Sequence, residues 1–102
     1  MEEVRSFAGM VDYQAGAVVS KTIVKKSKGT VTLFAFDAGQ SLSEHTVPHD
    51  ALVHVVEGEV EITVSGTPHL LKGGDVILMP GGKPHAVAAR SPFKMVLTMI
   101  RE

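Results

Sequence analysis

Short runs of alternating apolar and polar residues dominate the chain, and almost every run ends at a glycine-containing turn. The clearest run is residues 59–64, Glu-Val-Glu-Ile-Thr-Val, which follows Gly58. Because successive side chains of a strand point to opposite faces, this run has one wet face and one buried face, and Val60, Ile62 and Val64 point inward. Helical periodicity is almost absent. The pattern therefore predicts an all-β sandwich or barrel.

Seven strands are predicted, at residues 18–25, 30–37, 51–56, 59–64, 76–79, 85–89 and 93–101. No linker, repeat or low-complexity segment interrupts the 102 residues. We therefore expect a single domain over residues 1–102, in which residues 1–15 are a weakly patterned N-terminal segment.

Composition excludes several classes of function. Ten Lys and Arg against eleven Asp and Glu leave a net charge of −1, so the basic face that nucleic acid or an anionic membrane requires is missing. The chain has no cysteine, so any bound metal needs histidine or carboxylate ligands. The longest apolar runs, 51–56 and 95–100, are far shorter than the ~20 residues of a membrane span. Residues 1–11 do not resemble a signal peptide, so we expect a cytoplasmic location.

Two segments resemble the paired motifs of the cupin superfamily. The first motif is matched in its spacing by Gly39, His45 and Gly58, and the second by Gly74, Pro80, Gly82 and His85. Together the two segments span most of the chain. The resemblance implies a double-stranded β-helix, or jelly-roll barrel, of the small single-domain cupin 2 type.

The departures from these motifs concern the metal site that the resemblance implies. The second histidine of the first motif falls on Val47 and its glutamate on Ala51, so two of the four usual ligands are absent. The final asparagine of the second motif is replaced by Ala89. The resemblance thus leaves His45 and His85 at family ligand positions.

Other histidines are ranked by strand geometry. His49 would stand about 13 Å from His45 on a straight strand, but Pro48 between them favours a bend that brings His49 back. His54 has the opposite parity to Ala51 and should face away from the interior, and His69 is interpreted as structural. We therefore predict a metal site of His45, His49 and His85. Three neutral imidazoles suit a divalent transition metal such as Zn, Ni, Fe or Cu.

Two functions fit these residues. One is a metal-dependent barrel enzyme that acts on a small organic molecule by dioxygenase, isomerase or cyclase chemistry, as the resemblance implies. The other is a non-catalytic ligand-binding or sensor module that has lost part of the metal site. A third, less specific reading is a plain structural subunit. No catalytic residue is identified, although Glu44, Asp50 and Tyr13 are the acid–base candidates near the site.

The last strand is apolar on both faces, which points to self-association. Val96, Thr98 and Ile100 alternate with Met95, Leu97 and Met99, and the barrel interior can cover only one of these sets. In the run 51–56, the interior can likewise cover only Ala51, Val53 and Val55, so the other face remains uncovered. That face carries Leu52, His54 and Val56. Because soluble monomers rarely expose large apolar patches, we predict a homodimer that packs these outer faces together.

Overall fold

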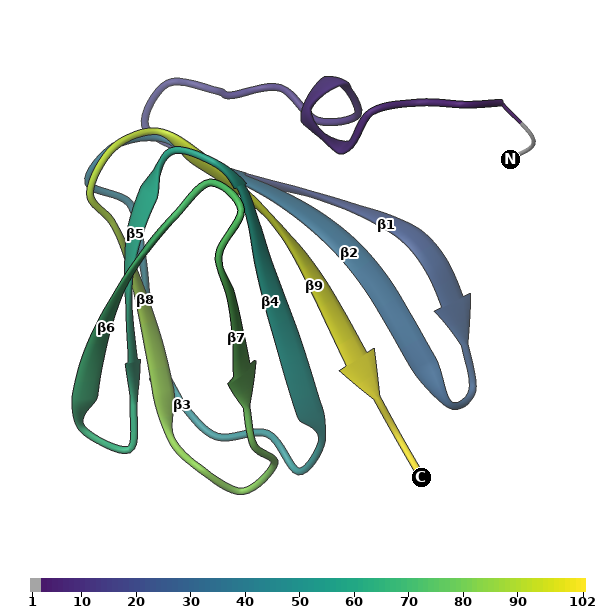
Figure 1. Cartoon of the computed structure of the whole chain (residues 1–102), viewed down its shortest axis with the longest axis vertical. Coiled ribbons are helices and arrows are strands. Elements are labelled where there is room, and N and C mark those ends of the chain that lie inside the picture. Colours follow the sequence, from purple (N-terminus) through teal and green to yellow (C-terminus); the bar gives the residue numbers. More distant parts are fainter. Residues whose placement is uncertain (1–2) are drawn as a thin grey trace.

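Nine strands within residues 3–102 form two antiparallel sheets that pack against each other (Figure 1). The structure is a computed structural model that describes these residues, and residues 1 and 2 of the predicted domain lie outside the described part. One sheet has the strand order β1-β2-β9-β4-β7 and the other β3-β8-β5-β6. The strands are β1 (Val18–Lys26), β2 (Gly29–Phe36), β3 (Ser41–His45), β4 (Asp50–Glu57), β5 (Glu59–Val64), β6 (Thr67–Lys72), β7 (Val76–Met79), β8 (His85–Ala89) and β9 (Phe93–Ile100). The predicted all-β jelly-roll barrel is confirmed.

The core lies between the two sheets and follows the predicted alternation. Val53 and Val55 of β4 and Val60 and Ile62 of β5 are fully buried, whereas their neighbours along each strand are more exposed. Phe36 and Phe93 stack in the same core with ring centroids 4.6 Å apart. The inward direction predicted for Val60 and Ile62 is therefore confirmed.

The prediction of seven strands missed two, which lie at the edges of the four-stranded sheet. β3 contributes Leu42 to the core and is otherwise polar, and β6 buries Leu71 alone. β6 also contains Pro68, which an edge strand tolerates because its nitrogen can face away from the sheet. Neither segment has enough apolar residues to show strand periodicity.

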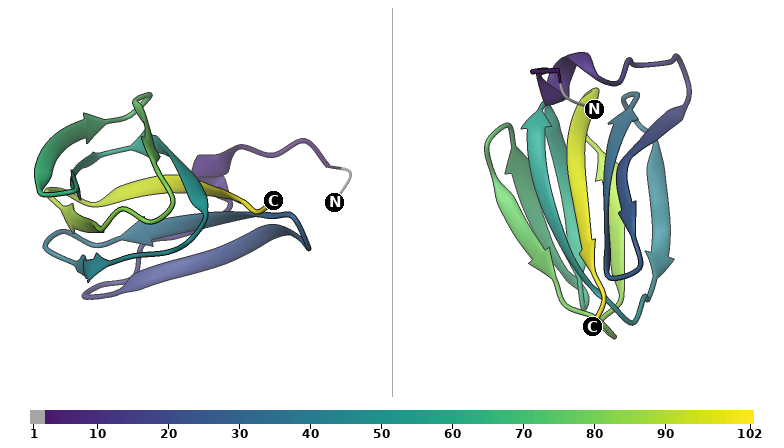
Figure 2. Two further views of the ribbon diagram at one scale, coloured as in Figure 1. Left: turned by 90° about the horizontal axis from the view of Figure 1, so that it is seen from below. Right: turned by 90° about the vertical axis from the view of Figure 1, so that its right-hand side faces the viewer.

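The N-terminal segment covers one end of the outer face of the five-stranded sheet (Figure 2). Met10 and Val11 pack on Leu33, Ala35 and Val96, which would otherwise be exposed. We call residues 3–17 the strap; it includes the short 3-10 helix η1 (Phe7–Gly9). Part of the cover that the sequence assigned to a second copy thus comes from the chain itself.

No helix among the described residues has both the length and the apolar character of a membrane span.

Gly58 joins the two sheets at a point where no larger residue fits. Its φ is +83°, and a Cβ built there would lie 2.1 Å from the carbonyl oxygen of Pro92 and 2.6 Å from Cβ of Phe93. Phe93 is fully buried, so it has little room to move. The turn between β4 and β5 therefore requires glycine for both conformation and space.

We predict that Gly58→Ala lowers the free energy of unfolding by about 3 kcal/mol or more, since it adds a clash with backbone to an unfavourable φ. Gly66→Ala is the matched control: its φ is +82°, but no atom lies within 4 Å of the added Cβ. That control should cost only about 1–2 kcal/mol. Urea unfolding of both variants measures the difference, and equal losses would contradict the close approach.

Candidate metal or ligand site

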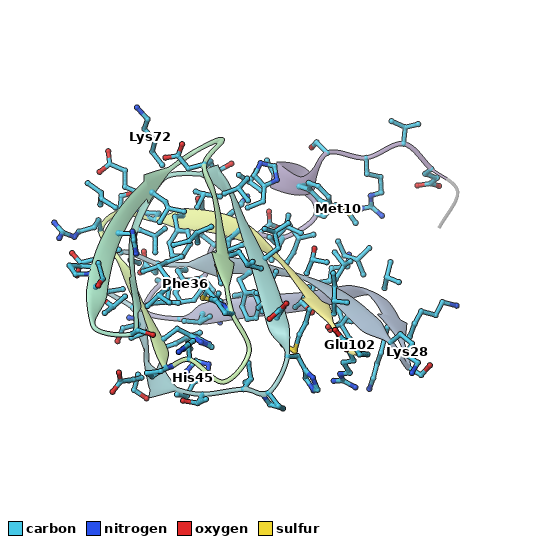
Figure 3. The ribbon with its side chains drawn as sticks, turned by 60° about the horizontal axis from the view of Figure 1, so that its bottom comes forward. Met10, Lys28, Phe36, His45, Lys72 and Glu102 are labelled. Atoms are coloured by element: carbon cyan, nitrogen blue, oxygen red, sulfur yellow. The ribbon has the colours of Figure 1, made fainter. Side chains whose placement is uncertain are left out.

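His45 lies at the end of the barrel away from the strap (Figure 3), and His85 lies beside it on the neighbouring strand. β3 pairs with β8, and a register shift between Leu42 and His45 sets His45 opposite His85. The shift is a β-bulge that places one extra residue in β3. In a regular strand, Glu44 instead of His45 would point inward on the same side as Leu42. The Nε2 atoms of the two histidines are 3.0 Å apart and the ring centroids 4.2 Å apart. The bulge therefore turns His45 toward its partner.

The hydrogen bonds assign the tautomers of the neutral pair. Nδ1 of His45 lies 2.8 Å from the carbonyl oxygen of Ser43, which can only accept, so His45 carries its proton on Nδ1. Nε2 of His45 is then a free acceptor, and Nε2–H of His85 donates to it. Nδ1 of His85 is left buried without a hydrogen-bond partner. Such an unsatisfied buried atom calls for a functional explanation.

Burial lowers the pKa of His85 below its usual value of 6.5, and the neighbouring His45 lowers it further. The backbone of Lys83 opposes this lowering of the pKa in part, although Nδ1 makes no hydrogen bond. The His85 side chain is only 4% exposed, so water does little to stabilise a charge there. His85 is therefore held in the neutral form, which is the form that binds metals.

This shift predicts a loss of stability in acid. Below about pH 6.5 the unfolded chain takes up a proton at His85 more readily than the folded protein does. The free energy of unfolding therefore decreases as the pH is lowered. We expect the urea midpoint to drop between about pH 7 and pH 5.5 in the unaltered protein and to drop less in His85→Gln. His69→Gln, on the exposed face of β6, should keep the full drop. An undiminished drop in His85→Gln would contradict the assignment.

The two positions where the family motif has further ligands are apolar here, and the structure shows where they lie. Ala51 is buried and points into the barrel, as expected from its parity. Val47 is half-buried, and its carbonyl oxygen accepts a hydrogen bond of 2.8 Å from the nitrogen of Gly82. Neither side chain can donate electrons to a metal.

His49 is not joined to the pair. It lines a hollow of about 400 Å³ with Ile100 and Glu102. Its loop is fixed to the loop after β7, because Asp50 Oδ1 accepts a hydrogen bond from the nitrogen of Gly81. Within residues 3–102, no group of three or more His, Asp or Glu side chains is placed to hold a metal ion. The structure thus brings two of the three predicted ligands together, and the three-histidine site stays a prediction.

The remaining candidates have other surroundings. Asp50 holds the loop described above, and Glu44 is exposed. Tyr13 lies on the strap, where its hydroxyl donates to Glu57 at 2.7 Å. His54 alternates with the buried Ala51 and Val53 and faces outward, as its parity predicted. None of these groups is bonded to the histidine pair.

Sequence reasoning missed one buried charged residue, Lys94. It lies on the outer side of β9, and its Nζ donates to the carbonyl oxygen of Ala8 at 2.6 Å. The signal in the sequence was a single lysine inside the apolar run 93–100. Lysine is rarely buried without a partner, so its presence in such a run indicates a specific contact.

The comparisons with known proteins agree with this fold. The cupin-domain family model matches residues 32–101, so the chain belongs to the cupin-domain family. No curated protein matches it. A conserved protein of unknown function from Streptococcus pyogenes is 30% identical with a TM-score of 0.95, and the alignment covers 100% of this chain and 90% of that one.

Two other solved structures show the same similarity. A cupin 2 conserved barrel domain protein from Leptotrichia buccalis is 41% identical with a TM-score of 0.88 over 92% of this chain. The alignment covers only 46% of that protein, so this chain spans about half its length. A cupin superfamily protein from Desulfitobacterium hafniense is 27% identical with a TM-score of 0.94, covering 100% of this chain and 94% of that one.

Proposed function

We propose that this cupin binds a divalent transition metal through His45 and His85 and holds a small organic molecule at the same end of the barrel. The observation that carries this proposal is the 3.0 Å spacing of the two Nε2 atoms. Imidazole nitrogens that share one ion at roughly 2.0–2.1 Å lie about 3.0–3.4 Å from each other, depending on the angle between them. The pair already has the spacing of two neighbouring ligands.

The surroundings of each ring support metal binding. The Ser43 carbonyl holds the proton of His45 on Nδ1, which leaves the Nε2 lone pair available. His85 offers its own Nε2 when its proton moves to the buried Nδ1, beside the Lys83 backbone. An imidazole site without carboxylate suits Zn, Ni, Fe or Cu. Such an ion, when bound, would polarise a carbonyl or hold an anionic chelating molecule.

The third ligand of this proposal remains His49. Its loop would have to move for His49 to reach the pair, because the hydrogen bonds of Asp50 and Val47 hold that loop to residues 81 and 82. Water or the organic molecule could fill the position otherwise. A variant at His49 distinguishes these two arrangements.

A second function is favoured by the side chains at the family ligand positions. Val47 and Ala51 have apolar side chains where the family motif has donors, so a non-catalytic barrel could bind a small molecule without metal. In that case the His45–His85 pair would hydrogen-bond the molecule directly. The choice between enzyme and sensor follows from whether metal is bound.

We predict that the purified protein binds close to one Zn²⁺ or Ni²⁺ per chain, measured by isothermal titration and elemental analysis. His45→Ala and His85→Ala should each weaken binding by about tenfold or more, whereas His69→Ala should not. A similar loss in His49→Ala would identify the third ligand. The melting temperature should rise with metal at pH about 7.5 and not at pH about 5, where imidazoles are protonated. No binding after reconstitution would favour the metal-free function.

We also propose that the protein works as a cytoplasmic homodimer, with no nucleic acid or membrane partner. The support for the dimer is the outer face of the five-stranded sheet below the strap. Its exposed apolar side chains come from neighbouring strands: Leu52 of β4, Val76 and Leu78 of β7 and Ile100 of β9. His54 lies half-buried among them.

The dimer prediction has a matched control on the other sheet. Leu52→Glu or Leu78→Glu should convert a dimer into a monomer of about 10.8 kDa in sedimentation equilibrium. Leu70→Glu changes a leucine on β6 that is more exposed than either of these and should leave the dimer intact. A monomeric unaltered protein at micromolar concentration would overturn the dimer, and a dimer that survives both outer-face variants would overturn the face.

A further inference from the structure

The strap is fastened to the sheet by a buried cation. Lys94 is 7% exposed, and its Nζ donates to the Ala8 carbonyl oxygen and lies 4.8 Å from the centroid of the Tyr13 ring. The hydroxyl of Tyr13 in turn donates to Glu57 at the end of β4. Burial, the hydrogen bond to Glu57 and its charge raise the pKa of Tyr13, so this hydroxyl stays a donor. Both groups that contact the ammonium belong to the strap.

A buried lysine normally needs a carboxylate partner, because desolvating its charge is costly. No carboxylate of the described residues lies within ion-pair distance of Lys94. Its partners are a backbone carbonyl and an aromatic face, and both are lost if the strap leaves. Lys94 and the strap therefore form one unit, which holds η1 against β4. We call η1 in this position the ridge, because it stands above the outer face of the sheet.

Beyond this ridge the outer face is apolar and bare. Its outward positions are mainly apolar, and Asp50 lies at their rim, opposite Ile100. They are Leu52, His54, Val76, Leu78, Thr98 and Ile100. Leu78 is 52% exposed and Ile100 is 59% exposed. The strap has exposed apolar side chains of its own, Phe7 at 42% and Tyr13 at 37%. Apolar surface thus continues from the strap onto the sheet.

The bare face alone is too small for a stable dimer. The bare residues come from three strands, β4, β7 and β9. Three strands about 4.8 Å apart, each showing about five residues at ~3.4 Å per residue, present roughly 250 Å². A standard interface buries about 800 Å² on each partner. The missing area is available on the strap, which lies on the same side of the sheet (Figure 2).

We infer that the strap of each copy packs on the bare outer face of the other copy, and that Lys94 is the residue that positions the strap for this contact. The inference rests on the proposed homodimer. A two-fold axis that lies across the strands turns one copy upside down, so the ridge at the top of one face meets the bare end of the other. Because η1 packs on β4, Phe7 then faces Leu52 and Leu78 of the second copy. The apolar character of this face favours self-pairing over a partner that needs charge complementarity.

The absence of cysteine makes the contact directly testable. Phe7→Cys and Leu78→Cys proteins, mixed and oxidised, should give a disulfide-linked heterodimer, whereas Phe7→Cys mixed with His69→Cys should not. A dimeric protein in which Phe7→Cys links only to itself, or to neither partner, would overturn the inference and leave the dimer standing. A monomeric unaltered protein would overturn the proposed dimer itself.

The positioning role of Lys94 has its own measurement. Lys94→Met should keep the fold by circular dichroism and weaken the dimer about tenfold or more in sedimentation equilibrium. Lys72→Met, on the exposed edge of β6, should leave the dimer unchanged. If Lys94→Met does not fold, Phe7→Glu on the exposed surface of the strap replaces it, with the same weakening expected. A dimer of unchanged strength in either variant would overturn the role of the strap.

Discussion

The packing of the two sheets against each other determines which side of every strand faces the interior, and both the site and the outer face follow from it. Val53 and Val55 meet Val60 and Ile62 across the core, which leaves Leu52 and His54 on the outside. On β8 the same parity directs His85 inward beside Val87. The bulge in β3 then brings His45 to the same side. One constraint of packing thus creates an imidazole pair at one end and an apolar outer face.

Two polar side chains are buried within the described residues, and each marks a region that does more than hold the fold together. His85 is neutral, is partnered by another imidazole and has an Nδ1 without a hydrogen-bond partner. These properties are consistent with a residue that binds a metal or a small molecule. Lys94 is partnered only by the strap. Each residue costs stability that an apolar side chain would not. In our account the burial of His85 is needed for binding, and the burial of Lys94 is needed for assembly.

Sequence reasoning was strongest where periodicity and motif spacing act together. The alternation of residues 59–64 predicted the inward side of β5, and motif spacing selected the two histidines that the structure brings together. It failed where neither signal exists. β3 and β6 are polar edge strands, and the strap has no repeating pattern because its contacts are made by single residues such as Met10. The position of His49 depends on hydrogen bonds between two loops, which no local pattern encodes.

The central claim is that His45 and His85 form one coupled pair whose Nε2 atoms bind a single ion. Two-bond proton–nitrogen NMR of the imidazole rings tests it most directly, because it reports the tautomer of each ring and its response to metal. In the metal-free protein we expect His45 to be protonated on Nδ1 and His85 on Nε2. On adding Zn²⁺, both Nε2 signals should shift together and reach their limit at the same ratio of metal to protein. Independent responses of the two rings, or a response confined to other histidines, would contradict the account.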